Sequence, residues 1–161
     1  FYSKYKIHSH MLLIKFKEKY NLNASTVILF NHDSIYRNKK FLLPRIVQYL
    51  KKKNLKKINE INKENIYGDF SHAEDICNGI LRLVELKKMP DKLILSSSKL
   101  TSINKLIKYG IYFFKFKIKL QEPNQASKKL LIGNNNLAKK ILHWKTKKNS
   151  FLNFKEILKN T

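Results

Sequence analysis

The chain has 161 residues, 43% of them hydrophobic, which is enough apolar side chain for a folded core and argues against global disorder. Its formal net charge of +23 suggests an anionic partner, but 31 of its 34 basic residues are lysine. Proteins that recognise nucleic acids favour arginine, whose forked guanidinium group binds phosphates and bases. Lys, Asn and Ile together supply 66 residues, a bias typical of compositional drift. We therefore expect no nucleic-acid partner.

The cysteine, the histidines and the lengths of the apolar runs bear on disulfides, metal sites and membrane association. The single cysteine, Cys77, allows no internal disulfide, which favours a cytoplasmic location, and we expect it to be packed within a helix. No apolar run approaches the ~20 residues that span a bilayer, so we expect no membrane association. His8, His10 and His143 have no metal-ligand partners at suitable spacing, and we expect no metal site.

Hydrophobic periodicity predicts helices that alternate with strands, which is typical of a layered α/β fold. In chain order we expect a helix over 2–20, a buried strand over 24–30, a polar turn over 31–38, and a helix over 41–52 with Pro44 in its first turn. A loop with a short strand follows over 51–66. Further on we expect a helix from Ser71 or His72 to about 87, a strand over 93–95, a helix over 102–109, a half-exposed strand over 112–120, and helices over 135–142 and 151–159.

The predicted strand over 24–30 is short, β-branched and almost entirely apolar. Such strands lie inside parallel sheets and need a neighbour on each side. The chain also begins at Phe1 without a methionine and enters a helical pattern directly. We therefore expect this sequence to be part of a longer protein that supplies the remaining strands.

Tyr2 and Lys6 lie four residues apart and would share one face of the first helix. An ammonium group beside a phenol stabilises the phenolate and lowers the pKa of the phenol from about 10, so that the phenolate can act as a base. The same spacing recurs at Tyr36/Lys40 and Tyr49/Lys53. Spacing alone therefore favours an ordinary exposed helix face for any one of these pairs.

The Tyr2/Lys6 pair belongs to a larger sequence pattern, which consists of four segments spread over the chain. They are Y-S-K-Y-K (Tyr2–Lys6), I-L-F-N-H-D-S (Ile28–Ser34), G-D-F-S-H-A-E-D (Gly68–Asp75) and I-G-N-N-N-L-A-K-K-I-L-H-W-K (Ile132–Lys145). Their order and spacing resemble the GDP-mannose 4,6-dehydratase family of extended short-chain dehydrogenase/reductases. In that family Y-x-x-x-K is followed by L-F-N-H-E-S-P-x-R, R-D-W-G-H-A-x-D and G-D-x-x-K-A-x-x-x-L-x-W-x-P.

The resemblance implies a fold, a ligand and an activity. The fold is the C-terminal part of a Rossmann-type α/β fold without the N-terminal glycine-rich βαβ half, since no G-x-x-G-x-x-G turn occurs here. Residues 1–50 would complete the Rossmann-type domain, and residues 51–161 would form most of the smaller substrate-binding part. The whole protein would be a homo-oligomer and an NADP-dependent lyase that converts GDP-mannose to GDP-4-dehydro-6-deoxy-mannose.

The resemblance also assigns roles to six residues. Tyr2 would be the catalytic base, and Lys6 would hold the nicotinamide ribose and tune that base. His32 and Arg37 would contact NADP. The nucleotide sugar would be bound by two residues, Asn31 and Arg45. From the residues alone, the segment around Asn31 and His32 is equally a turn, and Arg37 is a surface arginine.

Two arginines of the family are replaced, by Gly68 and by Asn124 within Pro123–Lys128. Both normally face the nucleotide diphosphate, so their loss weakens binding or changes the substrate. The family's catalytic serine or threonine and its glutamate lie upstream of the tyrosine. We expect the isolated chain to be inactive. A related epimerase or reductase, a non-catalytic remnant, and a basic nucleic-acid-binding protein supported by net charge alone remain the alternatives.

Overall fold

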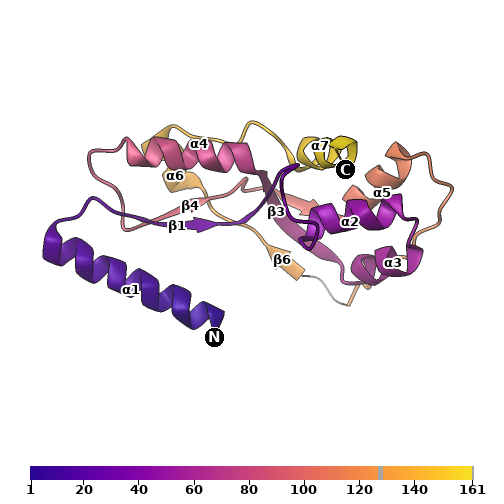
Figure 1. The fold of residues 1–161 in the computed structure, drawn as a ribbon, viewed down its shortest axis with the longest axis horizontal. Coiled ribbons are helices and arrows are strands. Elements are labelled where there is room, and N and C mark those ends of the chain that lie inside the picture. The colour runs from indigo at the N-terminus through magenta and orange to yellow at the C-terminus, as the bar shows by residue number, and fades with distance from the viewer. Residues whose placement is uncertain (127–128, 161) are drawn as a thin grey trace.

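The computed structural model has an α/β architecture and describes residues 1–126 and 129–160 (Figure 1). The last two residues of the Pro123–Lys128 segment and Thr161 lie outside the described residues. The elements in chain order are α1 (Tyr2–Tyr20), β1 (Thr26–Leu29), β2 (Asn31–Asp33), α2 (Leu42–Lys51), α3 (Leu55–Lys63), β3 (Ile66–His72), α4 (Ala73–Val84), β4 (Lys92–Leu95), β5 (Leu100–Ser102), α5 (Ile103–Phe113), β6 (Lys129–Leu131), α6 (Asn136–Leu142) and α7 (Ser150–Asn160).

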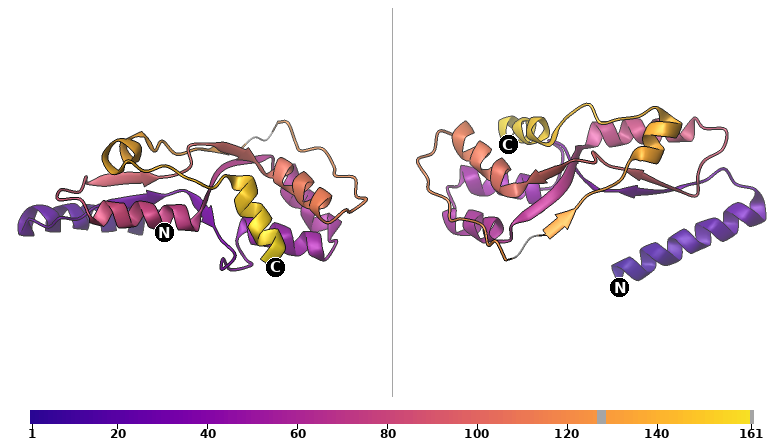
Figure 2. Two further views of the ribbon diagram at one scale, coloured as in Figure 1. Left: turned by 90° about the horizontal axis from the view of Figure 1, so that it is seen from above. Right: turned by 180° about the vertical axis from the view of Figure 1, so that it is seen from behind.

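One half of the molecule is built on a parallel pair of strands, β1 and β4. Their register runs from Thr26 opposite Lys92 to Leu29 opposite Leu95. Side chains of α4, β4 and α6 form one hydrophobic cluster together with Trp144, and Val27 of β1 packs against it. Figures 1 and 2 show α4 and α6 on one side of this pair and α1 on the other.

The other half is centred on β3, which pairs in parallel with β2 and β6 and antiparallel with β5. Phe70 of β3 joins a second hydrophobic cluster with buried side chains of α2, α3, α5 and α7. Val27 lies before residue 50 but packs against side chains of α4, β4 and α6, which come after residue 50 in the chain. Residues 43–50 likewise pack with the later helices α3, α5 and α7. The division of the chain at residue 50 stays a prediction.

The helix α1 stands off from the body of the protein, and each of its residues is exposed or half-buried. Polar contacts fasten it to the β1–β4 layer. His10 Nδ1 lies 2.8 Å from Thr26 Oγ1, and Lys17 Nζ donates to Asp91 at 2.8 Å and to the Met89 carbonyl at 3.1 Å. The apolar side chains of α1 consequently remain in contact with solvent in this chain.

All six predicted helices are confirmed, as is the strand over 93–95. The helix after β3 is capped by His72, whose Nδ1 accepts a hydrogen bond from the Glu74 backbone at 3.1 Å. Trp144 is 2% exposed and donates to the Asp75 carbonyl, as expected of a residue that anchors the C-terminal core.

The segment over 51–66 was predicted wrongly, since it contains the helix α3. Asn54 caps this helix by accepting from the Lys57 backbone at 3.1 Å. Its apolar stripe of Leu55, Ile58 and Ile61 recurs every three residues, but lysine and asparagine surround it and hide the helical period.

The strand predicted over 112–120 is also wrong. Residues 103–113 complete α5, and residues 116–120 are irregular. Phe116, Ile118 and Leu120 are half-buried against the second cluster while the lysines between them are exposed. The alternation therefore reflects an extended segment that packs one side on the core without joining a sheet.

Three further expectations need correction. The polar stretch predicted as a turn begins with a strand, β2, which pairs with residues 70–72 of β3. Cys77 is exposed rather than packed. The strand β1 is only half-buried, with Ile28 41% exposed, because within the described residues β4 is its one strand partner.

None of the helices in the described ranges is long and apolar enough to cross a membrane. Within those same ranges, no group of three or more His, Cys, Asp and Glu side chains is arranged to hold a metal ion.

Candidate functional site

Two neighbouring cavities lie where β1 ends and β2 begins. The larger, of about 680 Å³, lies between α1 and β1, and its wall includes Tyr2, Lys6 and His32. The smaller, of about 460 Å³, lies between β2 and the start of α2, and its wall includes Asn31, His32 and Arg37. His32 belongs to both walls, so five of the six predicted site residues line these two neighbouring cavities.

The first helical turn of α1 brings Tyr2 and Lys6 together, as their spacing predicts. Lys6 Nζ lies 5.5 Å from the centroid of the Tyr2 ring, within the range of a cation–π contact. The Tyr2 side chain is 74% exposed and lines the larger cavity opposite Thr26–Leu29 of β1. The phenol and the ammonium group therefore face the same space.

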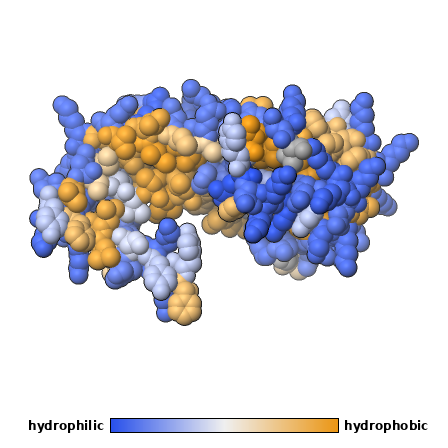
Figure 3. Space-filling view, in the orientation of Figure 1, coloured by the Kyte–Doolittle hydropathy of each residue, from blue (hydrophilic) through white to orange (hydrophobic). Residues whose placement is uncertain are grey.

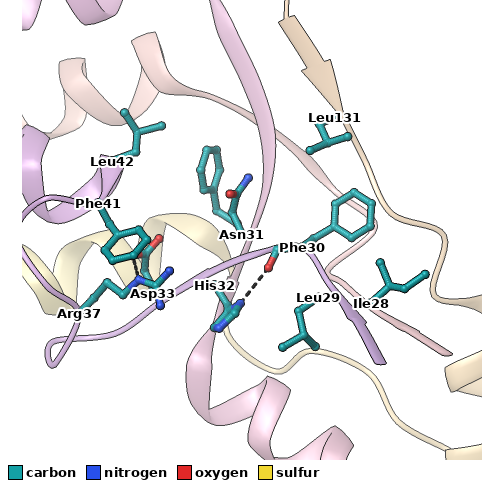
Figure 4. Close-up of a pocket in the computed structure, with 11 residues that line it drawn as sticks. Ile28, Leu29, Phe30, Asn31, His32, Asp33, Arg37, Phe41, Leu42 and Leu131 are labelled. Atoms are coloured by element: carbon teal, nitrogen blue, oxygen red, sulfur yellow. Dashed lines mark hydrogen bonds and ion pairs between the residues drawn. The ribbon is translucent and has the colours of Figure 1, made fainter. Parts of the chain in front are cut away.

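The His32 ring is held by the backbone at Phe30, which lies between β1 and β2. Its Nδ1 lies 2.9 Å from the Phe30 carbonyl oxygen, which can only accept, so Nδ1 carries the proton and donates. In the neutral ring Nε2 is then an acceptor. The strand pairing of Asn31 with Phe70 and of His32 with Ser71 fixes both residues at the edge of the two cavities (Figure 4).

Arg37 lies between two side chains that sequence analysis did not select. Its guanidinium carbon is 3.6 Å from the centroid of the Phe41 ring, and its Nε is 3.8 Å from Asp33 Oδ1 (Figure 4). Burial raises the pKa of the Asp33 carboxyl to about 6, although the charges of Arg37 and His32 act in the opposite direction. The sequence did contain a sign of Asp33, because the family motif also has an acidic residue directly after the histidine.

Arg45 lies apart from both cavities. It lines a separate cavity of about 220 Å³ together with Tyr49, Lys57, Glu60 and Glu64. The structure thus does not bring Arg45 together with the other five predicted residues.

Gly68 replaces a family arginine at a crowded point of β3. A Cβ atom at this position would lie 2.8 Å from the Phe70 ring and 3.6 Å from Asn31 Nδ2. Any larger side chain would therefore displace Phe70, which lines the smaller cavity. In this chain the Phe70 ring fills space next to Gly68.

Comparison with known proteins gives consistent matches. The sequence profile of the family described as GDP-mannose 4,6 dehydratase matches residues 1–161. A GDP-mannose 4,6 dehydratase of Dictyostelium discoideum is 22% identical over 91% of this chain and 48% of its own length. The GDP-mannose 4,6 dehydratase of Homo sapiens is 24% identical over 66% of this chain and 29% of its own length.

Solved structures agree on the fold. The structure of RMD from Pseudomonas aeruginosa complexed with NADPH matches with a TM-score of 0.80 at 14% identity, over 96% of this chain and 53% of that one. The dTDP-glucose 4,6-dehydratase of Bacillus anthracis in complex with NAD matches with a TM-score of 0.73 at 15% identity, over 92% and 47% of the two chains.

These matches confirm the predicted Rossmann-type fold of the short-chain dehydrogenase/reductases. The chain spans about half the length of the Dictyostelium relative and of both solved structures. Because the family profile matches from the first residue to the last, the chain belongs to the GDP-mannose 4,6-dehydratase family.

Proposed function

We propose that this chain is the C-terminal half of an NADP-dependent GDP-mannose 4,6-dehydratase and contributes the base and part of the cofactor site. The observation that carries the proposal is the single cavity lined by Tyr2, Lys6 and His32. Members of the matched family act on GDP-mannose by name, and two similar structures contain NADPH or NAD. The residues that complete the mechanism would come from the other half of the protein, so the isolated chain would be inactive.

The site residues fit a nicotinamide dinucleotide. The two cavities share Ile28, Leu29 and His32 in their walls, and the cation Arg37 lines the smaller one. Bound NADP would supply a hydride acceptor and donor for the sugar carbon. We assign His32 and Arg37 to the cofactor, and Asn31 to the sugar nucleotide.

In the proposed mechanism Tyr2, as its phenolate, takes the proton from the sugar hydroxyl whose carbon is oxidised, while the hydride of that carbon would pass to bound NADP. The Lys6 ammonium, on the same helix face, stabilises the phenolate and holds the ribose of the cofactor. Arg45 is the least supported substrate contact, because it lines a different cavity. A cytoplasmic location and a homo-oligomeric whole protein are part of the same proposal.

A second candidate is a related sugar-nucleotide epimerase or reductase, or a remnant without catalysis. The observation that favours it is Gly68, where a family arginine is absent and Phe70 fills the space. Without charge-assisted contacts to the diphosphate, affinity for GDP-mannose would fall. Product analysis with GDP-mannose separates this candidate from the first.

The test uses a chimaera that joins this chain to the N-terminal half of the Dictyostelium relative. With GDP-mannose and NADP, Tyr2→Phe should abolish keto-sugar formation and leave cofactor binding within about twofold, because the change removes a proton acceptor and little else. Tyr36→Phe is the matched control, since Tyr36 is 90% exposed and has a lysine at the same spacing. Unimpaired turnover by Tyr2→Phe would refute the catalytic assignment.

A further inference from the structure

The Arg37 side chain is held on two sides. The Phe41 ring covers one face of the guanidinium group at 3.6 Å, and Asp33 lies 3.8 Å from its Nε edge (Figure 4). In a guanidinium group the two terminal nitrogens point away from Nε. A face and an edge are thus fixed within the smaller cavity, while the terminal fork stays available for a ligand.

Asp33 is a buried carboxylate whose nearest opposite charge is Arg37. Its side chain is 7% exposed, and within the described residues neither its Oδ1 nor Arg37 Nε has a partner at hydrogen-bond distance. Other ionisable groups on this strand and on the elements packed against it are His32, His72 at the opposite register position of β3, and Glu74 and Asp75 in the first turn of α4, a helix that contacts β2. Two buried polar atoms of opposite charge that face each other restrain each other's orientation.

The start of α2 adds to the positive character of this wall. Phe41, its N-cap residue, supplies no side-chain acceptor, and no acidic residue occupies the first turn. The first turn of a helix presents free N–H groups and the positive end of the helix dipole. An anion held by Arg37 would lie beside that end.

We propose that Asp33 and Phe41 are positioning residues that hold the Arg37 guanidinium as a fork for a phosphate group of the dinucleotide cofactor. The inference rests on the proposed function, which assigns Arg37 to the cofactor. Arginine binds phosphate through two parallel N–H···O bonds, so its orientation decides its affinity. An unrestrained arginine loses rotamer freedom when it binds a ligand. Contact with Asp33 and Phe41, here called the Arg37 clamp, removes most of that loss beforehand.

The first experiment reads the clamp without any ligand. The chain contains only three arginines, so their side-chain Nε–Hε signals are resolvable by ¹⁵N NMR of the 161-residue protein. Between pH 5 and 8 the Arg37 signal should shift with a midpoint near 6 as Asp33 ionises. The shift should vanish in Asp33→Asn and persist in Asp33→Glu, which keeps the charge, and in Glu122→Gln, an exposed control. An Arg37 signal that does not respond to pH in the wild type overturns the proposal.

The second experiment adds inorganic pyrophosphate as the probe. It should perturb the Arg37 signal in the wild type, and Asp33→Asn and Phe41→Leu should each weaken this binding at least about fivefold, because the freed guanidinium loses rotamer freedom on binding. Asp33→Glu should restore it. Equal binding by Asp33→Asn and wild type overturns the positioning role and leaves the proposed function intact. Pyrophosphate binding that depends on Asp33, together with a chimaera that forms no keto-sugar from GDP-mannose, supports the positioning role and counts against the proposed function.

Discussion

The Asp69 carboxylate joins three separate segments of the chain, and its replacement by asparagine should be strongly destabilising. Asp69 has no exposed surface. Its Oδ1 accepts from the backbone and hydroxyl of Ser97 at 2.8 and 2.5 Å, and its Oδ2 accepts from the Ser98 backbone at 2.8 Å and the Gly133 backbone at 3.4 Å. The carboxylate thereby ties β3 to the loop after β4 and to the segment before α6.

The magnitude follows from these four bonds. Asparagine keeps one oxygen and so retains two bonds, while its amide NH₂ group faces two backbone N–H donors. Each hydrogen bond to a charged group contributes about 1.5–3 kcal/mol, and a buried donor left without an acceptor costs about 1–3 kcal/mol. Because the 3.4 Å bond is weak, we expect Asp69→Asn to lower the free energy of unfolding by about 3 kcal/mol.

Urea unfolding of the isolated chain, followed by the fluorescence of its single tryptophan, Trp144, measures this loss. With an m-value of roughly 2 kcal/mol per molar, the midpoint should fall by about 1.5 M. Glu122→Gln is the control, because exposed substitutions change stability by about 0.5 kcal/mol or less. A midpoint for Asp69→Asn within about 0.3 M of wild type, at unchanged m-value, would show that the four contacts do not stabilise the fold.

Three more predictions concern stability in the same assay. Burial raises the pKa of Asp33 from 3.8 to about 6, so its stabilising contribution is complete below pH 3.8 and is lost as the pH rises through 6. The free energy of unfolding of Asp33→Asn should therefore exceed that of wild type by about 1–2 kcal/mol at pH 7, and the difference should close near pH 4. An equal difference at both pH values contradicts this linkage. His72→Ala should cost about 1–2 kcal/mol by removing the cap of α4 and the bond to α7, and His72→Asn should recover the cap's share. Gly79→Ala should lower the free energy of unfolding by about 1–3 kcal/mol, although alanine has the better helix propensity, because the new Cβ would lie 2.9 Å from the Leu95 side chain. A gain in stability would show that the site relaxes.

The parts of the fold that were predictable from sequence are those set by local pattern. The helix over residues 2–20 and the cap at His72 depend on neighbours within a few residues, and both are confirmed. The strand β2 was not predictable in this way, because residues 31–33 pair with residues 70–72, about 40 positions further along. A polar stretch gives no local sign of such a partner.

The candidate site divides along the same line. The shared cavity of Tyr2, Lys6 and His32 follows from one helical turn and the strand that comes after it. The burial of Asp33 beside Arg37 depends on the pairing of β2 with the distant strand β3, which composition does not reveal. The predicted roles of these residues stay predictions until the variants are measured.

The half-exposed strand β1 has a practical consequence for handling the protein. Hydrophobic side chains gather over the β1–β4 layer in Figure 3, and Ile28 and Leu29 of β1 are 41% and 38% exposed. A strand edge beside such a patch is a template for aggregation when many copies are present. Concentrated preparations of the isolated chain should precipitate through β1, and Ile28→Lys, which puts a gatekeeper charge on that strand, should keep it in solution.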